Sequence, residues 1–538
     1  MSSAQHSERR YVGSYSIRSK RLKTAWDKLF FTLTCKNWIY FFSKEKLCIF
    51  ARYRIRLTVY KSRQMKFFGI FLDVNSIIYL IYVILIAGTV VVVISENRNP
   101  IRTMAWLLVL IFVPIIGFVL YYLFGQDTRR MRQISEKKYK TIKELSFKSL
   151  IPSRNIKMLP EYANLVKILE NSNLSPVLQG SKVEIITEGS RMFDVLLNDM
   201  KRAKHHIHIE FFIFKNDQTG RAVKEMLMKK ASEGVEVRFI YDNIANWMVP
   251  GWFYKEMKKS GVQVTSLMDA RFPKLANKIN YRNHRKVVVI DGSTAYVGGM
   301  NISNDYSINK NWRDTHLRIQ GQGALGLQAS FLIDWYSSGE VFLDDKKYFP
   351  EARNYTPNLM QIATGGPYSL YHNLLQATIN VIIGAKKYLY LQTPYFLPND
   401  VLFQALQMAC LGGVDVRLMV SQKSDSSYTD PAAHSYYEDL LEAGMKIYEM
   451  QGKFVHSKTI VADDTISVIG SANLDFRSFE TNFEINCYMY DPNIARQNKE
   501  IFFRDMELCR EINYEEWVQR PRWKKFFEST MRLFAPLM

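Results

Sequence analysis

Two stretches of the chain carry the same polar pattern: NHRKVVVIDGSTAYVGGMN from Asn283 to Asn301 and VHSKTIVADDTISVIGSAN from Val455 to Asn473. In each, His and Lys stand two residues apart, Asp follows five residues after the Lys, and Asn follows ten residues after the Asp. Apolar residues fill the space between Lys and Asp, which is typical of a buried strand. Four residue types repeated at one spacing indicate that a structural unit was duplicated.

The surroundings of the two motifs repeat as well. Helix-like and strand-like runs alternate from about Glu188 onward, and the run punctuated by Gly234 matches the run punctuated by Gly413. We therefore predict an α/β fold with two duplicated domains, at 186–350 and 351–538, which face each other and share one active site.

The motif residues suit chemistry on a phosphodiester. On a strand, positions i and i+2 point to the same side, so each motif presents its His and Lys on one face. A phosphodiester resists nucleophiles because its anionic oxygens repel them, and cations with amide donors would offset that charge. The two motifs supply these groups as Lys286, Lys458, Asn301 and Asn473.

The two histidines, His284 and His456, can divide the work. A neutral imidazole can attack phosphorus to give a covalent phosphohistidine, while a second imidazole protonates the leaving group and later reclaims the proton. A reference pKa of about 6.5 allows either role near neutral pH. Each histidine needs an orienting partner, and Asp314 and Glu484 lie at matched positions downstream of the two motifs. A surface carboxylate is the alternative interpretation of either acid.

The composition indicates a folded chain with an anionic partner. Among 538 residues, 47% are hydrophobic and the formal net charge is +21. The first 75 residues hold 16 Lys and Arg against four acids. Five cysteines without a Cys-x-x-Cys pair favour a reduced chain that faces the cytosol.

Two uncharged stretches, at 76–95 and 104–124, decide what kind of anionic partner is expected. Each has about the 20 residues that a helix needs to cross a bilayer, so we predict a transmembrane hairpin at 76–124. Two buried core helices are the alternative. Basic residues flank both ends of the hairpin, which orients the catalytic domains toward the cytoplasm. The partner is then anionic membrane lipid and not nucleic acid.

The remaining segments are assigned by their charge and aromatic content. Region 1–75 is basic and aromatic and is predicted to lie at the membrane interface, with a solvated basic tail as the alternative. Region 125–185 is predicted to be a basic linker.

The sequence resembles the bacterial cardiolipin synthases of the phospholipase D superfamily. The resemblance rests on the doubled His-x-Lys-x4-Asp motif and on the stretches QTPYFLP, GSANLDFRSFETNFE and RLFAPLM. It covers about residues 76 to 538, and only the N-terminal region is longer and more basic than the family pattern.

The resemblance implies transfer of a phosphatidyl group from one phosphatidylglycerol to another, with release of glycerol and without a cofactor or metal. It makes His284 the nucleophile and His456 the acid and base, although the sequence alone leaves the reverse open. Asp291 and Asp463 complete the catalytic motif and would organise the site. Asp314 and Glu484 match acids that steady the histidines. The location implied is the bacterial cytoplasmic membrane, with several passes.

Three other functions remain open at this stage. A membrane-anchored phospholipase D would give the same intermediate to water and form phosphatidic acid. A nuclease would fit the charge, and a lipid-binding scaffold would leave the histidines inert. The run HHIH at His205–His208 could suggest a metal site, but only His206 and His208 share a face on a strand and no Cys lies nearby. The oligomeric state and the preferred lipid donor stay unknown.

Overall fold

The computed structural model describes residues 65–67, 70–72, 74–95, 100–121, 125, 141, 160–267, 281–309, 311–367 and 369–538. The chain divides into two compact units, Met1–Phe118 and Val119–Met538. Most of the predicted interfacial region 1–75, and residues 126–140 and 142–159 of the predicted linker, lie outside the described residues.

The first unit contains a short antiparallel pair, β1 (Met65–Phe67) and β2 (Ile70–Leu72), and two helices that pack against each other, α3 (Val74–Ser95) and α4 (Pro100–Phe112). Helix α5 (Pro114–Leu120) follows α4, and the break between them falls at Pro114, which lacks a backbone N–H for the helical ladder. Within the described part of the chain, no helix meets the combined length and hydropathy needed to cross a membrane.

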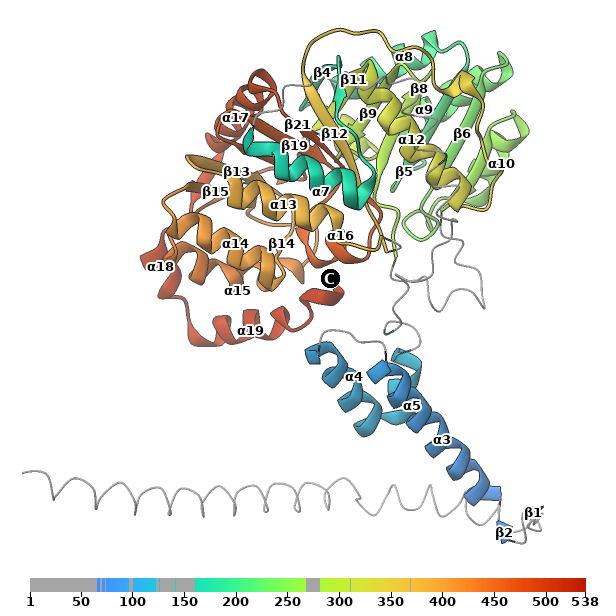
Figure 1. Cartoon of the computed structure of the whole chain (residues 1–538), viewed down its shortest axis with the longest axis vertical. Helices are drawn as coiled ribbons and strands as arrows, with labels where there is room; N and C mark the ends of the chain where they lie inside the picture. Colours follow the sequence, from blue (N-terminus) through green and yellow to red (C-terminus); the bar gives the residue numbers. More distant parts are fainter. Residues whose placement is uncertain are drawn as a thin grey trace, which may run out of the picture. The chain divides into compact units, whose positions relative to one another are not determined.

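The first half of the second unit folds around a seven-stranded sheet of described strands (Figure 1). In spatial order the strands are β4 (Lys182–Ile186), β11 (His316–Gln320), β9 (Thr294–Gly298), β8 (Lys286–Ile290), β5 (His206–Phe211), β6 (Glu236–Tyr241) and β7 (Gln263–Ser266). Strands β5, β6 and β7 run parallel, while the pairs on the other side of β5 are antiparallel. Its helices are α8 (Gly189–Arg202), α9 (Gln218–Ser232), α10 (Gly251–Lys259), α11 (Asn304–Ser307) and α12 (Gln322–Ser337).

The second half repeats this sheet and adds a strand at each edge, which gives nine described strands. Their order is β22 (Cys509–Glu511), β16 (Lys446–Met450), β15 (Asp415–Ser421), β13 (Tyr388–Gln392), β18 (Thr459–Ala462), β19 (Ile466–Gly470), β21 (Glu484–Met489), β12 (Leu359–Gly365) and β3 (Leu178–Gln179). The inner seven follow the same directions as their counterparts in the first half. The main helices are α13 (Asn373–Gly384), α14 (Asp400–Leu411), α15 (Thr429–Glu442), α16 (Phe476–Glu480), α17 (Pro492–Met506), α18 (Tyr514–Val518) and α19 (Arg522–Arg532). The mixed α/β fold with a duplicated domain is thus present.

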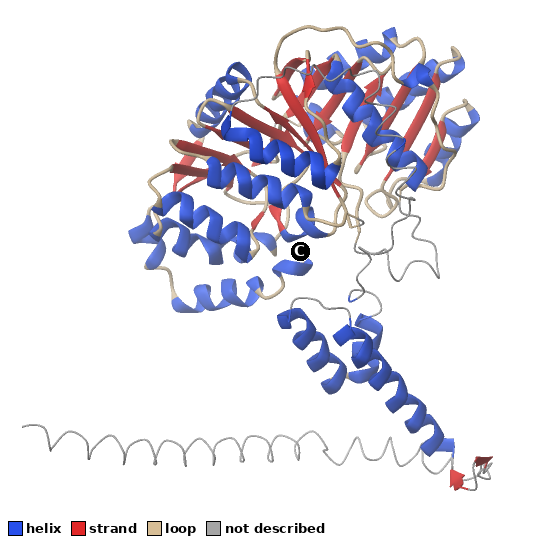
Figure 2. Ribbon diagram, in the orientation of Figure 1, coloured by secondary structure: helices blue, strands red, loops and turns tan. Residues whose placement is uncertain are grey.

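Helices cover the two sheets, so the central strands are buried on both faces (Figure 2). Every residue of β8 and of β18 is buried, which explains why both motifs continue as apolar runs. One apolar cluster joins the halves, with Val297 from the first sheet and Ile469 and Ile485 from the second. The cluster includes Val287 and Val289 of motif strand β8, and Ile469 belongs to β19, the strand that pairs with motif strand β18.

Residues 160–185 of the predicted linker differ from the prediction. They form η2 (Pro160–Tyr162), α7 (Ala163–Asn173), β3 and the first residues of β4. Although α7 precedes the first half in sequence, it packs against α13 of the second half, and β3 pairs with β12 (Figure 1). The cause is an apolar stripe of Leu165, Val166 and Leu169, which is buried in the core of the second half.

Candidate active site

Short parallel pairings between the halves bring the two motifs together. β10 (Trp312–Arg313) pairs with β17 (Phe454–Val455), and Asn283 forms a matching bridge with Phe483. The backbone N–H of His456 then donates to the carbonyl of Arg313 at 2.7 Å, and that of His284 donates to Phe483 at 3.0 Å. Each histidine therefore lies beside the backbone that leads into the acid of the opposite half.

The acids cross between the halves as a result. His284 Nδ1 lies 2.9 Å and 3.0 Å from the two carboxylate oxygens of Glu484, and His456 Nδ1 lies 2.7 Å from Asp314 Oδ2. When the carboxylate accepts a hydrogen bond from Nδ1–H, the proton of the neutral imidazole is on Nδ1 and the free lone pair is on Nε2. Both predicted acids thus contact a histidine of the opposite half: Glu484 of the second half contacts His284 of the first, and Asp314 of the first half contacts His456 of the second.

Burial keeps both imidazoles neutral. It lowers the pKa of His284 to about 4, although the charge of Glu484 acts in the opposite direction. Burial also lowers the pKa of His456 well below its ordinary value, and the positive charges of Lys458 and Lys286 lower it further. Lys286 of the first half thus acts electrostatically on His456 of the second half. A neutral imidazole is the form that a nucleophile requires.

The two acids differ in their charge state. Burial raises the pKa of Asp314 to about 6, against the lowering effect of Lys458. Burial raises the pKa of Glu484 as well, but His284 and Lys286 outweigh it and the pKa falls below its ordinary value. Ser471 also donates to Glu484 Oε2 at 2.5 Å. Glu484 is therefore more readily ionised than Asp314.

The motif lysines lie buried beneath the histidines. Lys286 Nζ donates to the backbone carbonyl of His284 at 2.6 Å, and Lys458 Nζ donates to that of His456. Burial lowers the pKa of Lys286 well below its usual range and that of Lys458 to about 8. The carboxylates of Asp314 and Glu484 act in the opposite direction but offset only part of the cost of burial, so the site favours an anionic ligand.

The motif asparagines are engaged with protein groups. Asn301 Nδ2 donates to the Tyr306 hydroxyl at 2.8 Å, and that hydroxyl lies 3.3 Å from His456 Nδ1. Asn473 Nδ2 donates to Asp475 Oδ2 at 2.9 Å, while its buried Oδ1 has no hydrogen-bond partner among the described residues. Either amide would have to exchange its present partner to reach a phosphate.

The sequence places Asp291 and Asp463 in the catalytic set, but in the structure they do not lie beside the histidines. Each follows the far end of its motif strand, five residues and thus roughly 16 Å from the lysine at about 3.3 Å a residue. Each accepts three backbone N–H groups at the start of the neighbouring strand, those of residues 204–206 and 386–388. Both have positive φ, 51° and 53°. Their role in this structure is to close a turn.

Four residues near the histidines have no place in the sequence prediction: Tyr306, Asp475, Arg285 and Arg313. Arg285 Nε donates to the carbonyl of Glu484 at 3.1 Å and its guanidinium pairs with Asp334. Arg313 Nη1 donates to Ser457 Oγ at 3.0 Å and its Nε donates to Asp505. The two arginines therefore clamp the backbones that cross between the halves. Their position directly beside a motif histidine or acid is the signal that could have identified them.

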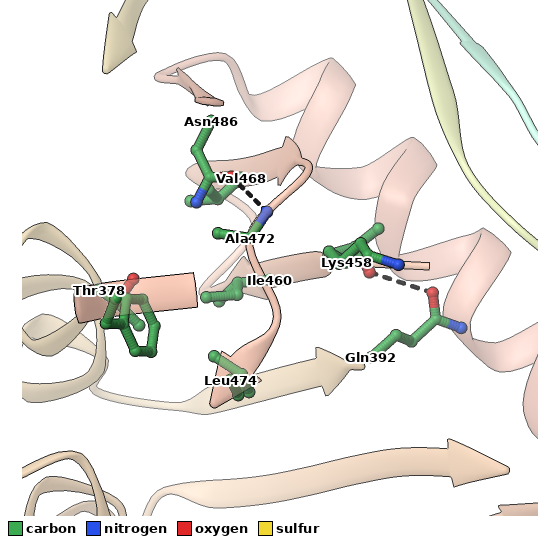
Figure 3. Close-up of a pocket in the computed structure, with 10 residues that line it drawn as sticks. Thr378, Gln392, Lys458, Ile460, Val468, Ala472, Leu474 and Asn486 are labelled. Carbon is green, nitrogen blue, oxygen red and sulfur yellow. Dashed lines mark hydrogen bonds between the residues drawn. The ribbon is translucent and has the colours of Figure 1, made fainter. Parts of the chain in front are cut away.

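A small cavity lies behind Lys458, lined in addition by Gln392, Thr459 and Asn486 (Figure 3). Its volume is about 10 Å³. One water at most fits such a space, so the cavity is too small for a lipid headgroup. Thr459 Oγ1 donates to Gln392 Oε1 at 3.0 Å along its wall.

Within the run at His205–His208, His205 is exposed and His206–His208 are buried in the first half. His206 and His208 share one face of β5, and both contact Gln328 of α12, at 3.3 Å and 2.8 Å. His208 also stacks on Phe331. Among the described residues, no group of three or more His, Cys, Asp or Glu side chains is placed to hold a metal ion.

Comparison with known proteins identifies the family. The model described as "Cardiolipin synthase, PLD-like domain" matches residues 196–325 and 378–506, one match in each half. The major cardiolipin synthase ClsA of Bacillus subtilis (strain 168) is 36% identical over 485 residues, which cover 87% of this chain and 100% of that protein. The chain belongs to the cardiolipin synthase family of the phospholipase D superfamily.

Other members of the cardiolipin synthase family give the same result. A cardiolipin synthase of Clostridium perfringens (strain SM101 / Type A) is 37% identical over 458 residues, 82% of this chain and 95% of that protein. A model described as "Phospholipase_D-nuclease N-terminal" matches residues 77–126. The crystal structure of phosphatidylserine synthase from Haemophilus influenzae Rd KW20 shares the fold, with a TM-score of 0.53 at 15% identity over 70% of this chain and 100% of that one.

Proposed function

We propose that this member of the cardiolipin synthase family joins two phosphatidylglycerols into cardiolipin and releases glycerol. The observation that carries the proposal is the crossed pair of histidines, each held by the acid of the other half. The chain is a phosphatidyltransferase, and the residue roles below extend that assignment.

In the first step, Nε2 of neutral His284 attacks the phosphorus of one phosphatidylglycerol. The bond between phosphorus and the glycerol oxygen breaks, and His456 gives that oxygen a proton, so glycerol leaves and a phosphatidyl-histidine remains. His456 must be protonated for this step. The anionic phosphate supplies the charge that favours the imidazolium, because it raises a pKa that burial alone depresses.

In the second step, the terminal hydroxyl of a second phosphatidylglycerol gives its proton to His456 and attacks the same phosphorus. The phosphorus–nitrogen bond breaks, cardiolipin leaves, and both histidines return to their starting forms. One phosphodiester replaces another, so the exchange requires no external source of energy.

The two lysines would offset the negative charge that grows on the phosphate oxygens in each transition state. Their depressed pKa values support this role, since an approaching phosphate relieves the cost of burying two cations. Asn301 and Asn473 would add amide donors after release from Tyr306 and Asp475.

We propose further that residues 76–124 anchor the enzyme in the cytoplasmic membrane as a helical hairpin, with the catalytic unit on the cytoplasmic side. Support comes from the two uncharged stretches, from the family match over residues 77–126 and from the basic flanks. Several apolar side chains of α3 and α4 are exposed, including Ile84, Val91 and Phe112, as expected for a lipid-facing surface.

The test is a product analysis of the purified full-length protein in phosphatidylglycerol vesicles, with lipids resolved by mass spectrometry. We expect cardiolipin and glycerol in equal amounts, with no loss of activity in the presence of a chelator. Phosphatidic acid without cardiolipin would assign the protein to lipid hydrolysis and contradict the proposal.

A further inference from the structure

Helix α19 buries an acidic side chain and exposes aromatic side chains, which is the opposite of a typical surface helix. Its one acid, Glu528, is 2% exposed, whereas Trp523 and Phe526 are 73% and 75% exposed. Glu528 is held inside by Arg520 Nη1 at 2.9 Å and by the neighbouring His434. Burial of the glutamate fixes the rotation of the helix and turns its aromatic side outward.

The exposed apolar residues of this segment form a stripe. They lie three or four and then seven residues apart, which keeps them on one side of the helix and past its end: Trp523, Phe526, Phe527, Leu533 and Phe534. The chain then ends in η4 (Ala535–Leu537), which packs against α16. Helix α16 starts directly after Asp475, the partner of Asn473. The end of the stripe, at Leu533 and Phe534, therefore lies close to the second half of the active site.

A second exposed apolar group flanks the first half of the site. The loop between β6 and α10 exposes Trp247 (78%) and Met248 (79%), and Trp252 at the start of α10 is half exposed. The stem of this loop is tied to the site, because the backbone N–H of Asn283 donates to Asp242 Oδ2 at 2.8 Å.

A further bond ties the loop to the ring beside the nucleophile. Asn246 Nδ2 donates to the Phe212 carbonyl at 2.7 Å, and the Phe212 ring packs edge-on against His284. The loop is therefore anchored at the site while its tip faces outward.

Basic residues accompany both groups. Helix α19 carries Arg522, Lys524 and Lys525 next to its aromatic side chains, and α10 exposes Lys255, Lys258 and Lys259. Aromatic side chains with interleaved cations suit the headgroup region of an anionic bilayer, where the rings enter the acyl boundary and the cations meet phosphates.

We infer that Trp247, Met248 and Trp252 of the first half and Trp523, Phe526, Phe527, Leu533 and Phe534 of the second form one docking surface for an anionic phospholipid membrane, here termed the aromatic rim. The rim flanks the two crossed histidines and seats the site at the lipid surface. The inference rests on the proposed function, because it names the surface from which that site takes its substrate.

Leu411 provides a matched control. It is 76% exposed at the end of α14, as apolar and as accessible as the residues of the rim. Helix α14 ends there just before β15, whose first residue, Asp415, pairs with Tyr388 at the start of β13. The motif residue Lys458 precedes Thr459, which pairs with Gln392 at the opposite end of β13. Leu411 therefore lies at the end of the sheet away from the site.

The test uses the full-length protein with a single nitroxide label at position 248, 523, 526 or 411, in vesicles of phosphatidylglycerol and phosphatidylcholine. We expect collisions with a neutral water-soluble nickel chelate to fall about fivefold at 248, 523 and 526 relative to 411, with a matching rise in collisions with oxygen. High salt should weaken the effect. Equal nickel access at 411 and at 523 and 526 would overturn the inference. Protection in detergent without phosphatidylglycerol, together with cross-links between copies at 523, would identify a second copy as the occupant and also overturn it.

An activity measurement separates docking from folding and from catalysis. Phe526→Asp should lower the rate on vesicles about tenfold and leave the rate on a soluble short-chain phosphatidylglycerol unchanged, while Leu411→Asp changes neither. Equal loss on both substrates would assign Phe526 to stability and contradict docking. His284→Ala should dock as the wild type does. Product formation retained in this variant would contradict the proposed chemistry alone, whereas loss of label protection in the wild type would contradict the rim alone.

Discussion

The two halves of the catalytic unit share one strand order but surround their histidines differently. His284 faces both oxygens of Glu484 and the edge of Phe212. His456 faces one oxygen of Asp314 and packs near Tyr306, Trp312 and Phe454. The duplicated scaffold thus explains why two imidazoles meet, whereas single substitutions around them explain how the two imidazoles can differ in role.

One matched position illustrates how the difference arises. Ser471 donates to Glu484, and the corresponding residue of the first half is Gly299. A Cβ atom at Gly299 would lie 2.1 Å from Asp314 Oδ1, so any side chain there would displace the acid. Asp314 therefore lacks the hydroxyl donor that helps to keep Glu484 ionised. Glu484, whose pKa is lowered, stays ionised and suits a histidine that forms a covalent bond. Asp314, whose pKa is raised to about 6, suits a histidine that exchanges protons.

Removal of either imidazole should have the largest effect. We expect His284→Ala and His456→Ala each to lower cardiolipin formation about 10⁴-fold, because the two groups act in one sequence of steps. The double variant should be no worse than either single one. Initial rates in phosphatidylglycerol vesicles measure this, and activity within tenfold of wild type in either single variant would break the account.

The crossed acids should come next. Glu484→Gln and Asp314→Asn keep the shape of the pair but remove the charge that orients Nδ1–H, and we expect a loss of about 100-fold for each. The pH dependence should distinguish them. The pKa of Asp314 is about 6, so the wild-type rate should fall as pH decreases through about 6, when Asp314 takes up a proton.

Asp314→Asn should lose that acid limb, and Glu484→Gln should keep it. A profile of kcat/KM against pH for the three proteins measures this. An acid limb near 6 that persists in Asp314→Asn would assign the titration to another group.

Tyr306 tests the asymmetry directly. Its hydroxyl contacts both Asn301 Nδ2 and His456 Nδ1, and the matched position five residues after Asn473 is Ser478. Tyr306→Phe should reduce the rate about tenfold, as expected for one or two hydrogen bonds in a buried site. Ser478→Ala should cost less, because the Ser478 hydroxyl accepts from the backbone N–H of Asn473 and, among the described residues, no hydrogen bond joins it to a histidine. Equal losses would show that the halves are functionally equivalent.

Lys458 should set the alkaline limit. Its pKa is lowered to about 8, so the cation is present below that pH and is lost above it. We expect kcat/KM to fall as pH rises through about 8. Lys458→Arg should lower the rate severalfold at pH 7 but move this limb upward, because guanidinium stays charged. An unchanged limb in Lys458→Arg would place the titration elsewhere.

The smallest effect on the chemistry should come from Asp291 and Asp463. Each closes an equivalent turn, so Asp291→Ala and Asp463→Ala should destabilise the fold similarly, by about 1–3 kcal/mol through loss of hydrogen bonds to three backbone N–H groups. Thermal unfolding measures this, and the rate per folded molecule should stay within a fewfold of wild type. A large loss of rate in protein that remains folded would return these acids to the catalytic set.

Much of this fold follows from the sequence pattern. The apolar runs after Lys286 and Lys458 are buried strands, and the alternation of helices and strands in the two halves gives matching sheets. The crossing of Asp314 and Glu484 could not be predicted, because it depends on short inter-half pairings at Arg313 and Phe483 that no local pattern encodes.

The position of the motif aspartates, in contrast, was accessible from the sequence. The four apolar residues between Lys286 and Asp291 are nearly a whole strand, which places the Asp at its far end. The exchange of α7 into the second half is a third case. It follows from an apolar stripe of Leu165, Val166 and Leu169 in α7. The net positive charge of the whole predicted linker drew attention away from this stripe.

The division of labour between the two histidines is tested most directly with a phosphatidyl ester of p-nitrophenol, whose leaving group needs no proton. The account predicts that His456→Ala releases a burst of one p-nitrophenolate per enzyme and carries the phosphatidyl group on His284, as peptide mass spectrometry would show, while His284→Ala gives no burst. A burst in His284→Ala with the adduct on His456, or cardiolipin formation by the wild type without any phosphatidyl-histidine, would contradict it.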